Sequence, residues 1–337
     1  MKAFVTAPLT KEGLDRLRER MEVTYEPWHE TREFLFSAKE LVDKLAGVDV
    51  FVSEADNLSA EVIEATSLKI IALARNDPNT IDLPAATRRG IPVLYAPQRN
   101  SDSVADLAVC LILALARKLV QVDRFLHSGE FEVSDFEDWV STYTKFTGFE
   151  LGGKTVGIVG FGGIGRRVAA RLRPFGVKLL AYDPYAPDGA FVEHDAKKVD
   201  LEELMRQSDV VTIHAAPTDE TNGLISEDLI KLMKPTAVFV NTAKGSIVDE
   251  EALLEALQDG RIAGAALDVF QVEPLDEDNE FLELENCIVL PHFGGNTDAV
   301  VRNQTELVVN GLLALLDGKE PPNVINPEVL PGFFGEN

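Results

Sequence analysis

The chain has 337 residues, of which 45% are hydrophobic and 26% charged, and its formal net charge is -24 at pH 7. This length and composition predict two globular domains and argue against a disordered chain. The acidic excess repels nucleic acid and anionic membrane surfaces, so neither is expected as a partner. Solubility through charge and adaptation to high salt are two explanations of the acidity that the sequence leaves open.

The cysteines and the N-terminal segment favour a cytoplasmic protein. Cys110 and Cys287 lie in apolar runs, which is typical of small core residues in a reducing compartment. The two cysteines and five histidines show no metal-ligand spacing, so no metal site is expected. The first residues, MKAFVTAPLT, have no signal-peptide pattern, and the longest apolar run, residues 107–116, is too short to span a bilayer.

The first hundred residues alternate between short apolar runs and helical patterns. Strands are predicted at residues 2–6, 48–52, 70–74 and 91–95, and a helix at residues 11–19. Residues 101–125 then form one long helical pattern, with Asp102 as a candidate cap. Residues 128–153 are less regular and resemble a connecting arm that is a candidate oligomer contact.

A second alternating series begins at residue 154. Its strands are predicted at residues 156–160, 178–182, 210–214, 237–241, 263–268 and 287–290. A last helix at 297–316 precedes a Pro-rich tail, GKEPPNVINPEVL, which we expect to pack on the first lobe. Apolar strands separated by helices predict an α/β protein with two Rossmann-like lobes, each built on a parallel sheet.

The most specific local signal is the stretch GKTVGIVGFGGIGRRVAARL, in which a predicted strand, a glycine loop and a helix follow one another. Gly160 permits a tight turn, Gly162 lets the backbone approach a pyrophosphate, and Gly165 allows the helix to pack closely on the strand. The helix N-terminus then offers free N–H groups to an anion. This pattern predicts a dinucleotide site.

Asp183, at the end of the next predicted strand, supports the same interpretation. A carboxylate there accepts hydrogen bonds from the ribose hydroxyls and repels a 2′-phosphate, which predicts NAD rather than NADP. The alternative is a glycine-rich turn followed by an Asp that caps a helix.

Four polar residues follow predicted strands of the second lobe: Lys244, Asp268, Glu273 and His292. Ligands of open parallel sheets bind at the carboxyl ends of the strands, so these side chains are candidates for one site. Oxidation of an alcohol by a nicotinamide requires a base, and a His paired with a Glu suits that role. Alone, His292 could equally be a hydrogen-bonded loop residue. Asp268 could cap a helix, stabilise the fold or contact the cofactor amide.

The chain resembles the D-isomer-specific 2-hydroxyacid dehydrogenases, a group that includes phosphoglycerate, glyoxylate/hydroxypyruvate and formate dehydrogenases. The resemblance covers nearly the whole chain and rests on GFGGIGRRVA, AYDP, NTAKGSIVDEEAL, AALDVFQVEP, LPHFGGNT and NVINPEVL, in that order. It implies that residues 1–101 and the C-terminal return, 297–337, form a discontinuous substrate-binding domain. An inserted NAD-binding domain would span residues 102–296, and the active site would lie between the two domains.

The resemblance also implies roles for individual residues. His292 is expected to be the general acid/base, with Glu273 as its partner and Lys244 as a catalytic cation. The expected cofactor contacts are Val104, Gly160, Gly162, Gly163, Ile164, Gly165, Asp183, Ala215, Thr242, Asp268 and Gly295. Members of the family usually dimerise through the NAD-binding domain, so a homodimer is expected, with a small anionic substrate.

Two positions depart from the family pattern. Lys244 stands where the family usually has an arginine that binds the substrate carboxylate; the charge is kept, but the bidentate geometry is lost. The usual glycine-rich turn of the first lobe is replaced by Arg75, Asn76 and Asp77, which become candidate substrate-binding residues, although Arg75 could simply pair with Asp77 at the surface. A polar pocket of this kind would suit a sugar acid or a phosphorylated acid.

The expected function is reversible hydride transfer between a D-2-hydroxy acid and NAD, with His292 as acid/base. One alternative is an NAD(H)-sensing regulatory protein with little turnover, which the two departures favour and the His–Glu pair disfavours. Another is an enzyme of the same fold that acts on a substrate without a carboxylate. The sequence does not name the substrate or the physiological direction.

Overall fold

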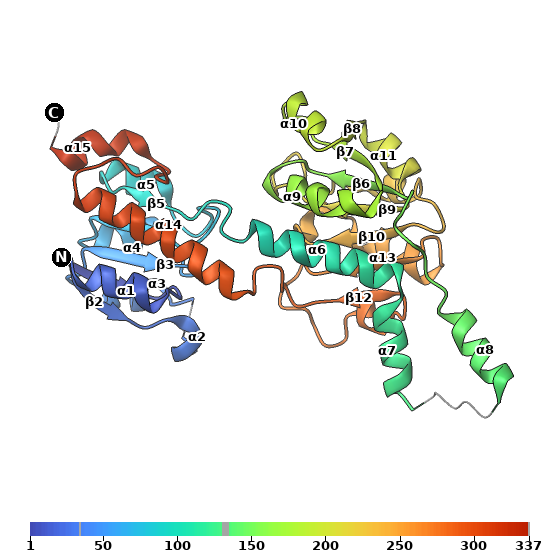
Figure 1. Cartoon of the computed structure of the whole chain (residues 1–337). Helices are drawn as coiled ribbons and strands as arrows, with labels where there is room; N and C mark the ends of the chain where they lie inside the picture. The colour runs from blue at the N-terminus through green and yellow to red at the C-terminus, as the bar shows by residue number, and fades with distance from the viewer. Residues whose placement is uncertain (34, 130–134, 336–337) are drawn as a thin grey trace. The chain divides into compact units, whose positions relative to one another are not determined.

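The computed structural model describes residues 1–33, 35–129 and 135–335, and the chain divides into two compact units (Figure 1). Unit 1 comprises residues 1–100 and 297–337, and unit 2 comprises residues 101–296. Each unit contains one sheet, and all pairs of named strands are parallel. The predicted α/β class with two parallel-sheet lobes is confirmed.

The sheet of unit 1 has the strand order β2-β1-β3-β4-β5. The strands are β1 (Lys2–Val5), β2 (Glu22–Tyr25), β3 (Val50–Ser53), β4 (Ile70–Leu73) and β5 (Val93–Leu94). Four of them overlap the strands predicted from apolar runs. The prediction missed β2 because this edge strand, EVTY, alternates between exposed and half-buried residues and forms no apolar run.

Helices cover both faces of this sheet, which is why β3 and β4 are buried along their whole length. They are α1 (Lys11–Arg18), α2 (Trp28–Thr31), α3 (Ala38–Lys44), α4 (Ala60–Ala65), α5 (Leu83–Arg88), α14 (Asp298–Leu316), the 3-10 turn η4 (Pro327–Val329) and α15 (Leu330–Phe334). The tail pairs antiparallel with β5, because Ile325 N–H donates to Val93 O at 2.8 Å and Tyr95 N–H donates to Asn323 O at 3.0 Å. The expected packing of the tail on the first lobe is confirmed.

The sheet of unit 2 has the strand order β12-β11-β10-β9-β6-β7-β8. The strands are β6 (Thr155–Val159), β7 (Lys178–Tyr182), β8 (Ala196–Lys198), β9 (Val210–Ile213), β10 (Val238–Asn241), β11 (Gly264–Leu267) and β12 (Cys287–Val289). All except β8 were predicted; β8 reads AKK and has no apolar run. Strands β7 and β9 flank β6, so the order reverses at β6, and ligands of such sheets bind where it reverses.

The helices of unit 2 lie between these strands and in an arm beside them. They are α6 (Ser101–Ala116), α7 (Leu119–His127), α8 (Phe136–Lys145), α9 (Gly163–Leu172), α10 (Asp188–Glu193), α11 (Leu201–Gln207), α12 (Glu227–Ile230) and α13 (Glu250–Gln258), with 3-10 turns η1 (Arg173–Phe175), η2 (Gly245–Ile247) and η3 (Glu280–Glu283). Within the described ranges, no helix is long and apolar enough to cross a membrane.

The prediction of one helix over residues 101–125 was wrong. The helix ends at Ala116, and Lys118 has a left-handed backbone with φ 51° before α7 begins. Phe149 N–H donates to Ala116 O at 2.8 Å, and a Cβ on Gly148 would lie 2.2 Å from the same oxygen. Residues 148–149 therefore cross the end of α6, and Phe149 N–H binds the last carbonyl of that helix. The sequence did not predict this tertiary contact, because no Gly or Pro near residue 118 marks the end of the helix.

The expected irregular arm, residues 128–153, contains the regular helix α8 (Figure 1). Residues 130–134 of that arm lie outside the described residues. Asp135 starts α8 by accepting a hydrogen bond from Asp138 N–H at 2.9 Å. This local cap, followed by the acidic residues Glu137 and Asp138 in the first turn, is a helix-start signal that was available in the sequence.

Candidate active site

The glycine loop after β6 has the geometry that a dinucleotide site requires. Gly160 has φ +89°, and a Cβ there would lie 2.4 Å from Ala215 N, at the end of the neighbouring strand β9. A Cβ on Gly165 would lie 2.1 Å from Gly160 O, whereas a Cβ on Gly162 would meet nothing within 4 Å. Gly160 and Gly165 are therefore required for packing, and Gly162 leaves the backbone open to an incoming ligand.

Helix α9 begins directly after this loop. Its first residues, Gly163 and Ile164, follow the N-cap Gly162, which has no side chain with which to cap their amides. The loop carbonyls are held instead: Arg166 Nε donates to Phe161 O at 2.8 Å, and Arg167 donates to Gly163 O at 2.9 Å. Uncapped amides at a helix N-terminus fit the pyrophosphate of a dinucleotide.

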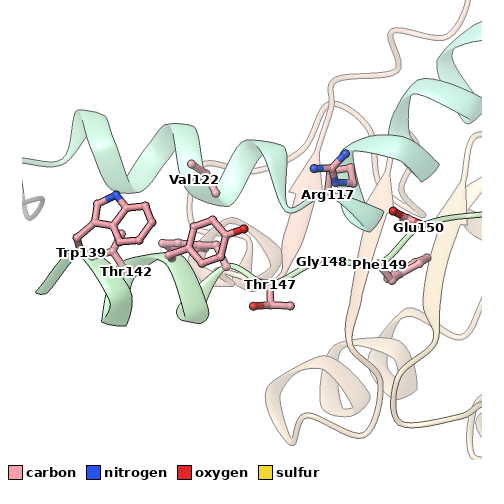
Figure 2. Close-up of a pocket in the computed structure, with 10 residues that line it drawn as sticks. Arg117, Val122, Trp139, Thr142, Thr147, Gly148, Phe149 and Glu150 are labelled. Atoms are coloured by element: carbon pink, nitrogen blue, oxygen red, sulfur yellow. The ribbon is translucent and has the colours of Figure 1, made fainter. Parts of the chain in front are cut away.

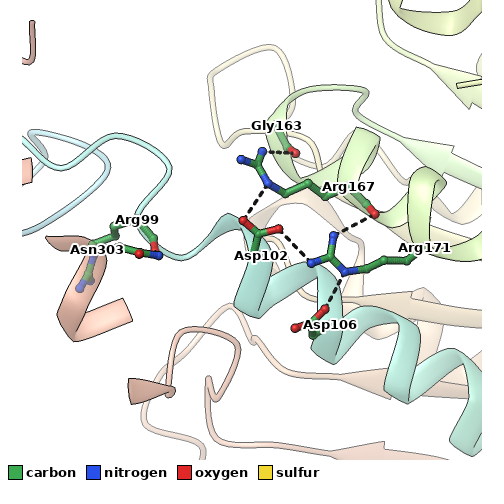
Figure 3. A network of polar contacts seen from close by, with 7 residues as sticks. All are labelled: Arg99, Asp102, Asp106, Gly163, Arg167, Arg171 and Asn303. Carbon is green, nitrogen blue, oxygen red and sulfur yellow. Dashed lines mark hydrogen bonds and ion pairs between the residues drawn. The ribbon is translucent and has the colours of Figure 1, made fainter. Parts of the chain in front are cut away.

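Helix α9 is joined to α6 by an ion-pair network (Figure 3). Asp102 contacts Arg171 at 2.9 Å and Arg167 at 3.2 Å, and Arg171 also contacts Asp106 at 2.6 Å. The hydrogen bond from Arg171 is the main reason that the pKa of Asp102 lies below its usual value. Asp102 was a candidate cap, but α6 begins at Ser101, so Asp102 lies within the first turn of the helix. Its carboxylate connects that turn to α9.

Asp183 follows β7 and accepts three backbone hydrogen bonds. One oxygen accepts from Phe161 N–H at 2.7 Å, and the other accepts from Tyr185 N–H at 2.8 Å and Ala186 N–H at 2.9 Å. The carboxylate therefore fixes the end of β7 to the glycine loop. This position beside the loop is the one from which an acidic residue contacts the ribose of a bound dinucleotide.

Two buried polar side chains follow β9 and β10, at the same edge of the sheet as the glycine loop. His214 Nε2 contacts Thr212 Oγ1 at 2.9 Å, and burial lowers the pKa of this imidazole to about 3. Among the described residues, His214 Nδ1 and Thr242 Oγ1 have no hydrogen-bond partner. Unsatisfied polar atoms at this edge of the sheet fit a site that receives a polar ligand.

His292 and Glu273 form a direct pair. The imidazole Nδ1–H donates to Glu273 Oε2 at 2.7 Å, and Glu273 Oε1 accepts from Phe270 N–H at 3.0 Å. With Nδ1 bound in this way, Nε2 is left as the free ring nitrogen. His292 itself has a left-handed backbone with φ 59°, and its N–H donates to Asp268 O at 2.8 Å.

Asp268 supports the loop that carries His292. Asp268 is 1% exposed, and its carboxylate accepts from Phe293 N–H at 2.5 Å and Gly294 N–H at 2.8 Å. Burial raises the pKa of Asp268, and these two backbone donors oppose that effect. The observed contacts match the fold-supporting alternative; a contact to the cofactor amide stays a prediction.

The start of α6 packs against the same loop. Ser103 Oγ donates to Gly294 O at 2.8 Å, and the Val104 side chain lies 3.3 Å from where a Cβ of Gly294 would be. Gly295 follows directly and is half-buried. The predicted positions Val104 and Gly295 therefore lie beside the His292 loop within unit 2.

Lys244 lies in a turn that the Asn241 side chain closes. Asn241 Nδ2 donates to Lys244 O at 3.0 Å, and Asn241 Oδ1 accepts from Ala243 N–H at 3.0 Å. Within residues 1–33, 35–129 and 135–335, the Lys244 ammonium has no hydrogen-bond or ion-pair partner. In a chain of net charge -24, an unpaired half-buried ammonium is available to bind an anion.

The Lys244 turn and the Glu273 loop are packed together. A Cβ on Gly245 would lie 2.0 Å from the Phe270 carbonyl carbon and 2.3 Å from Gln271 N. On the other side of the same peptide, Gln271 N–H donates to Glu250 Oε1 at 2.6 Å. Sequence reasoning did not identify Asn241 or Glu250, because both act through contacts that the order of residues does not reveal.

Unit 1 carries the predicted residues Arg75, Asn76 and Asp77 after β4. Arg75 lies 3.7 Å from Asp77 and donates to Glu54 O at 3.5 Å, so the surface-pair alternative is observed, although at long distances. Asn76 Oδ1 accepts from Gln98 N–H at 2.6 Å. These three residues therefore lie together, at the carboxyl end of a strand of the other unit.

A second arginine of unit 1 is held more firmly. Arg99, drawn in Figure 3, pairs with Glu54 at 2.7 Å and contacts Gln304 Oε1. The side chains of Arg99 and Glu54 are each less than one-fifth exposed. Glu54 and Gln304 therefore fix the position of the Arg99 guanidinium. Sequence reasoning identified neither of these two residues.

The described residues contain no group of three or more His, Cys, Asp or Glu side chains that could hold a metal ion. Unit 2 contains a paired imidazole, a dinucleotide loop and an ammonium that has no partner among the described residues. All three lie at the carboxyl edge of one sheet, after β6, β10 and β12.

Comparison with known proteins agrees with this geometry. Residues 109–294 match the family model described as D-isomer specific 2-hydroxyacid dehydrogenase, NAD binding domain. A glyoxylate reductase from Thermococcus gammatolerans is 40% identical over 98% of this chain and 99% of that protein. The crystal structure of TT0316 protein from Thermus thermophilus has a TM-score of 0.85 at 34% identity, covering 96% of this chain and 100% of that one. D-2-hydroxyisocaproate dehydrogenase has a TM-score of 0.82 at 26% identity, covering 97% and 100%.

Proposed function

Since the chain belongs to the D-isomer specific 2-hydroxyacid dehydrogenase family, we propose that His292, Glu273 and Lys244 carry out its reaction. The protein is an NAD-dependent oxidoreductase that interconverts a 2-hydroxy acid and its 2-keto acid. The observation that supports the proposed roles is the 2.7 Å contact between His292 and Glu273, at the same sheet edge as the Lys244 turn and the glycine loop.

Each residue has a defined task in this proposal. Bound NAD supplies the hydride acceptor for oxidation, and NADH supplies the donor for reduction. His292 Nε2 takes the hydroxyl proton of the D-2-hydroxy acid in oxidation and returns a proton to the carbonyl oxygen in reduction. Glu273 fixes the imidazole tautomer and stabilises the imidazolium. Asp183 favours NAD over NADP, because its carboxylate repels a 2′-phosphate.

Two cations are proposed to bind the substrate anion. Lys244 binds the carboxylate as a single ammonium, and Arg75 contributes a second positive charge. The relatives named glyoxylate reductase make glyoxylate the first substrate to test. The contacts proposed for Arg75, Asn76 and Asp77 are polar, so a hydroxylated or phosphorylated acid is the next candidate class.

Lys244 variants test this assignment. We expect Lys244→Ala to raise the KM for a 2-keto acid about 10- to 100-fold, because a charge-assisted hydrogen bond contributes about 1.5–3 kcal/mol. Lys244→Arg should restore binding and raise activity on simple 2-keto acids. The measurement is NADH consumption across 2-keto acids, sugar acids and their phosphates, with NADPH compared.

Three results of that screen are informative. An unchanged KM in Lys244→Ala would remove Lys244 from the substrate site. Activity only on ketones without a carboxylate would favour the alternative substrate class. Tight NADH binding without turnover on any substrate would favour an NAD-sensing protein, which the family membership and the intact His–Glu pair disfavour.

We further propose a cytoplasmic homodimer that forms through unit 2, with no nucleic acid or membrane partner. Helix α8 exposes the stacked rings of Phe136, Trp139 and Tyr143, which are 76%, 47% and 70% exposed. A hollow of about 560 Å³ lies between α7, α8 and the segment that follows (Figure 2). An apolar surface of this kind is typical of a protein interface, and a second copy is the partner that a two-fold dimer provides.

The dimer is tested by changing its proposed contact. We expect Trp139→Lys to convert the dimer into a monomer in light scattering after gel filtration, because it places a charge within the apolar surface. Val192→Lys is the control, since Val192 is 80% exposed on α10, in the same unit. A monomeric wild-type protein, or a Trp139→Lys variant that still dimerises, would contradict this contact.

A further inference from the structure

Glu250 connects the Lys244 turn to the Glu273 loop. It is the first residue of α13, and its Oε1 accepts the Gln271 N–H at 2.6 Å. We propose that Glu250 is a positioning residue that holds Glu273 against His292 and adds negative charge behind that pair. This inference rests on the proposed function, because it assigns a role relative to His292 and Glu273.

The loop that carries Glu273 is held from two sides. Gly245 packs directly on the peptide between Phe270 and Gln271, where a Cβ would lie 2.0 Å from the carbonyl carbon. The N–H of that peptide, from Gln271, donates to Glu250 at 2.6 Å. The preceding amide, Phe270 N–H, donates to Glu273 at 3.0 Å. A shift of Gln271 therefore moves the amide that positions Glu273.

Gln271 is fixed by its side chain as well as by its amide. Its Nε2 donates to Val248 O at 2.9 Å, two residues before Glu250. Asp249, between them, caps α13 by accepting from Ala252 N–H at 3.1 Å. The start of α13 is thus a rigid base to which the loop is attached at two points.

Glu250 also acts through its charge. Burial raises the pKa of Glu250, the Gln271 N–H opposes that effect, and the negative charge of Glu273 adds to the rise. Glu273 binds the imidazole directly, and Asp268 interacts electrostatically with both members of the pair. Glu250 interacts with Glu273, and the cation Lys244 precedes Gly245, which packs on the Glu273 loop. Removal of one carboxylate makes the imidazolium less stable, so the site loses its proton donor at a lower pH.

The test compares Glu250→Gln, Glu250→Ala and Glu251→Gln in NADH-dependent reduction of a 2-keto acid. Glu251 is the exposed next residue of α13, so its variant is a matched control for charge. In Glu250→Gln we expect the alkaline decline of the rate to move down by about half a pH unit. In Glu250→Ala, which also loses the acceptor, kcat should fall about tenfold, since misplacement of a supporting group carries such penalties. Glu251→Gln should show neither change, and NADH binding should be unaffected throughout.

The outcomes separate this inference from the proposed function. A pH profile of Glu250→Gln that matches Glu251→Gln, with full kcat in Glu250→Ala, overturns the role of Glu250 alone. The proposed function itself is overturned if the wild-type protein turns over no 2-keto acid. It is also overturned if turnover is undiminished in a His292 variant. Equal melting temperatures of the folded variants show that an effect on kcat does not arise from unfolding.

Discussion

Replacement of His292 by alanine is expected to lower turnover in both directions by about a hundred- to ten-thousand-fold, the usual contribution of a positioned acid/base. NADH should still bind, because the glycine loop and Asp183 do not depend on the imidazole. The measurements are steady-state rates with NAD and NADH and a separate titration of NADH fluorescence. The control is His127→Ala, since His127 is exposed on α7.

The backbone of His292 requires a second variant. Its φ of 59° lies in the left-handed region, where alanine is strained and asparagine is tolerated. His292→Asn should therefore keep the loop conformation and the fold while it removes the proton-transfer group. Loss of turnover in both variants, with unchanged NADH binding in the asparagine variant, assigns the effect to chemistry. Near-normal turnover of His292→Asn would rule out the role given to His292.

The sequence predicted the parts of the fold that depend on local pattern. Strands β3, β4 and β9 are buried on both faces, so each appears as a short apolar run. Strands β2 and β8 lie at sheet edges and contain exposed polar residues, so no run marks them. The break between α6 and α7 depends on Phe149, which lies more than 30 positions further along the chain.

Some residues of the candidate site could likewise be predicted from the sequence, and others could not. His292 and Glu273 were predicted because family motifs place them after neighbouring strands, and their carboxylate–imidazole contact is observed. Asp268 was ambiguous, since its residue type permits a cap, a loop support or a ligand contact. Its burial and its two backbone donors establish the loop support. Glu250 could not be predicted, because an acidic residue in the first turn of a helix is ordinary for a helix start.

The second large effect is expected from Gly245→Ala. The added methyl group would lie 2.0 Å from the Phe270 carbonyl carbon and 2.4 Å from its oxygen, and these are backbone atoms that no rotamer change can remove. The Lys244 turn and the Glu273 loop must therefore separate. A displacement of about 1 Å at a catalytic group can lower kcat about a hundredfold, and overpacking destabilises a fold by about 1–3 kcal/mol.

The control for this change is Gly189→Ala, because a Cβ on Gly189 in α10 would meet nothing within 4 Å. That variant should keep full activity and the wild-type melting temperature. In Gly245→Ala, kcat should fall much further than stability alone explains, so rates are compared well below the melting temperature of the variant. This result would show that the His292–Glu273 pair and the Lys244 ammonium both depend on the packing of Gly245 against Phe270 and Gln271. If Gly245→Ala kept its kcat and its melting temperature, the two segments would be independent, and the positioning argument for Glu250 would lose the fixed loop on which it depends.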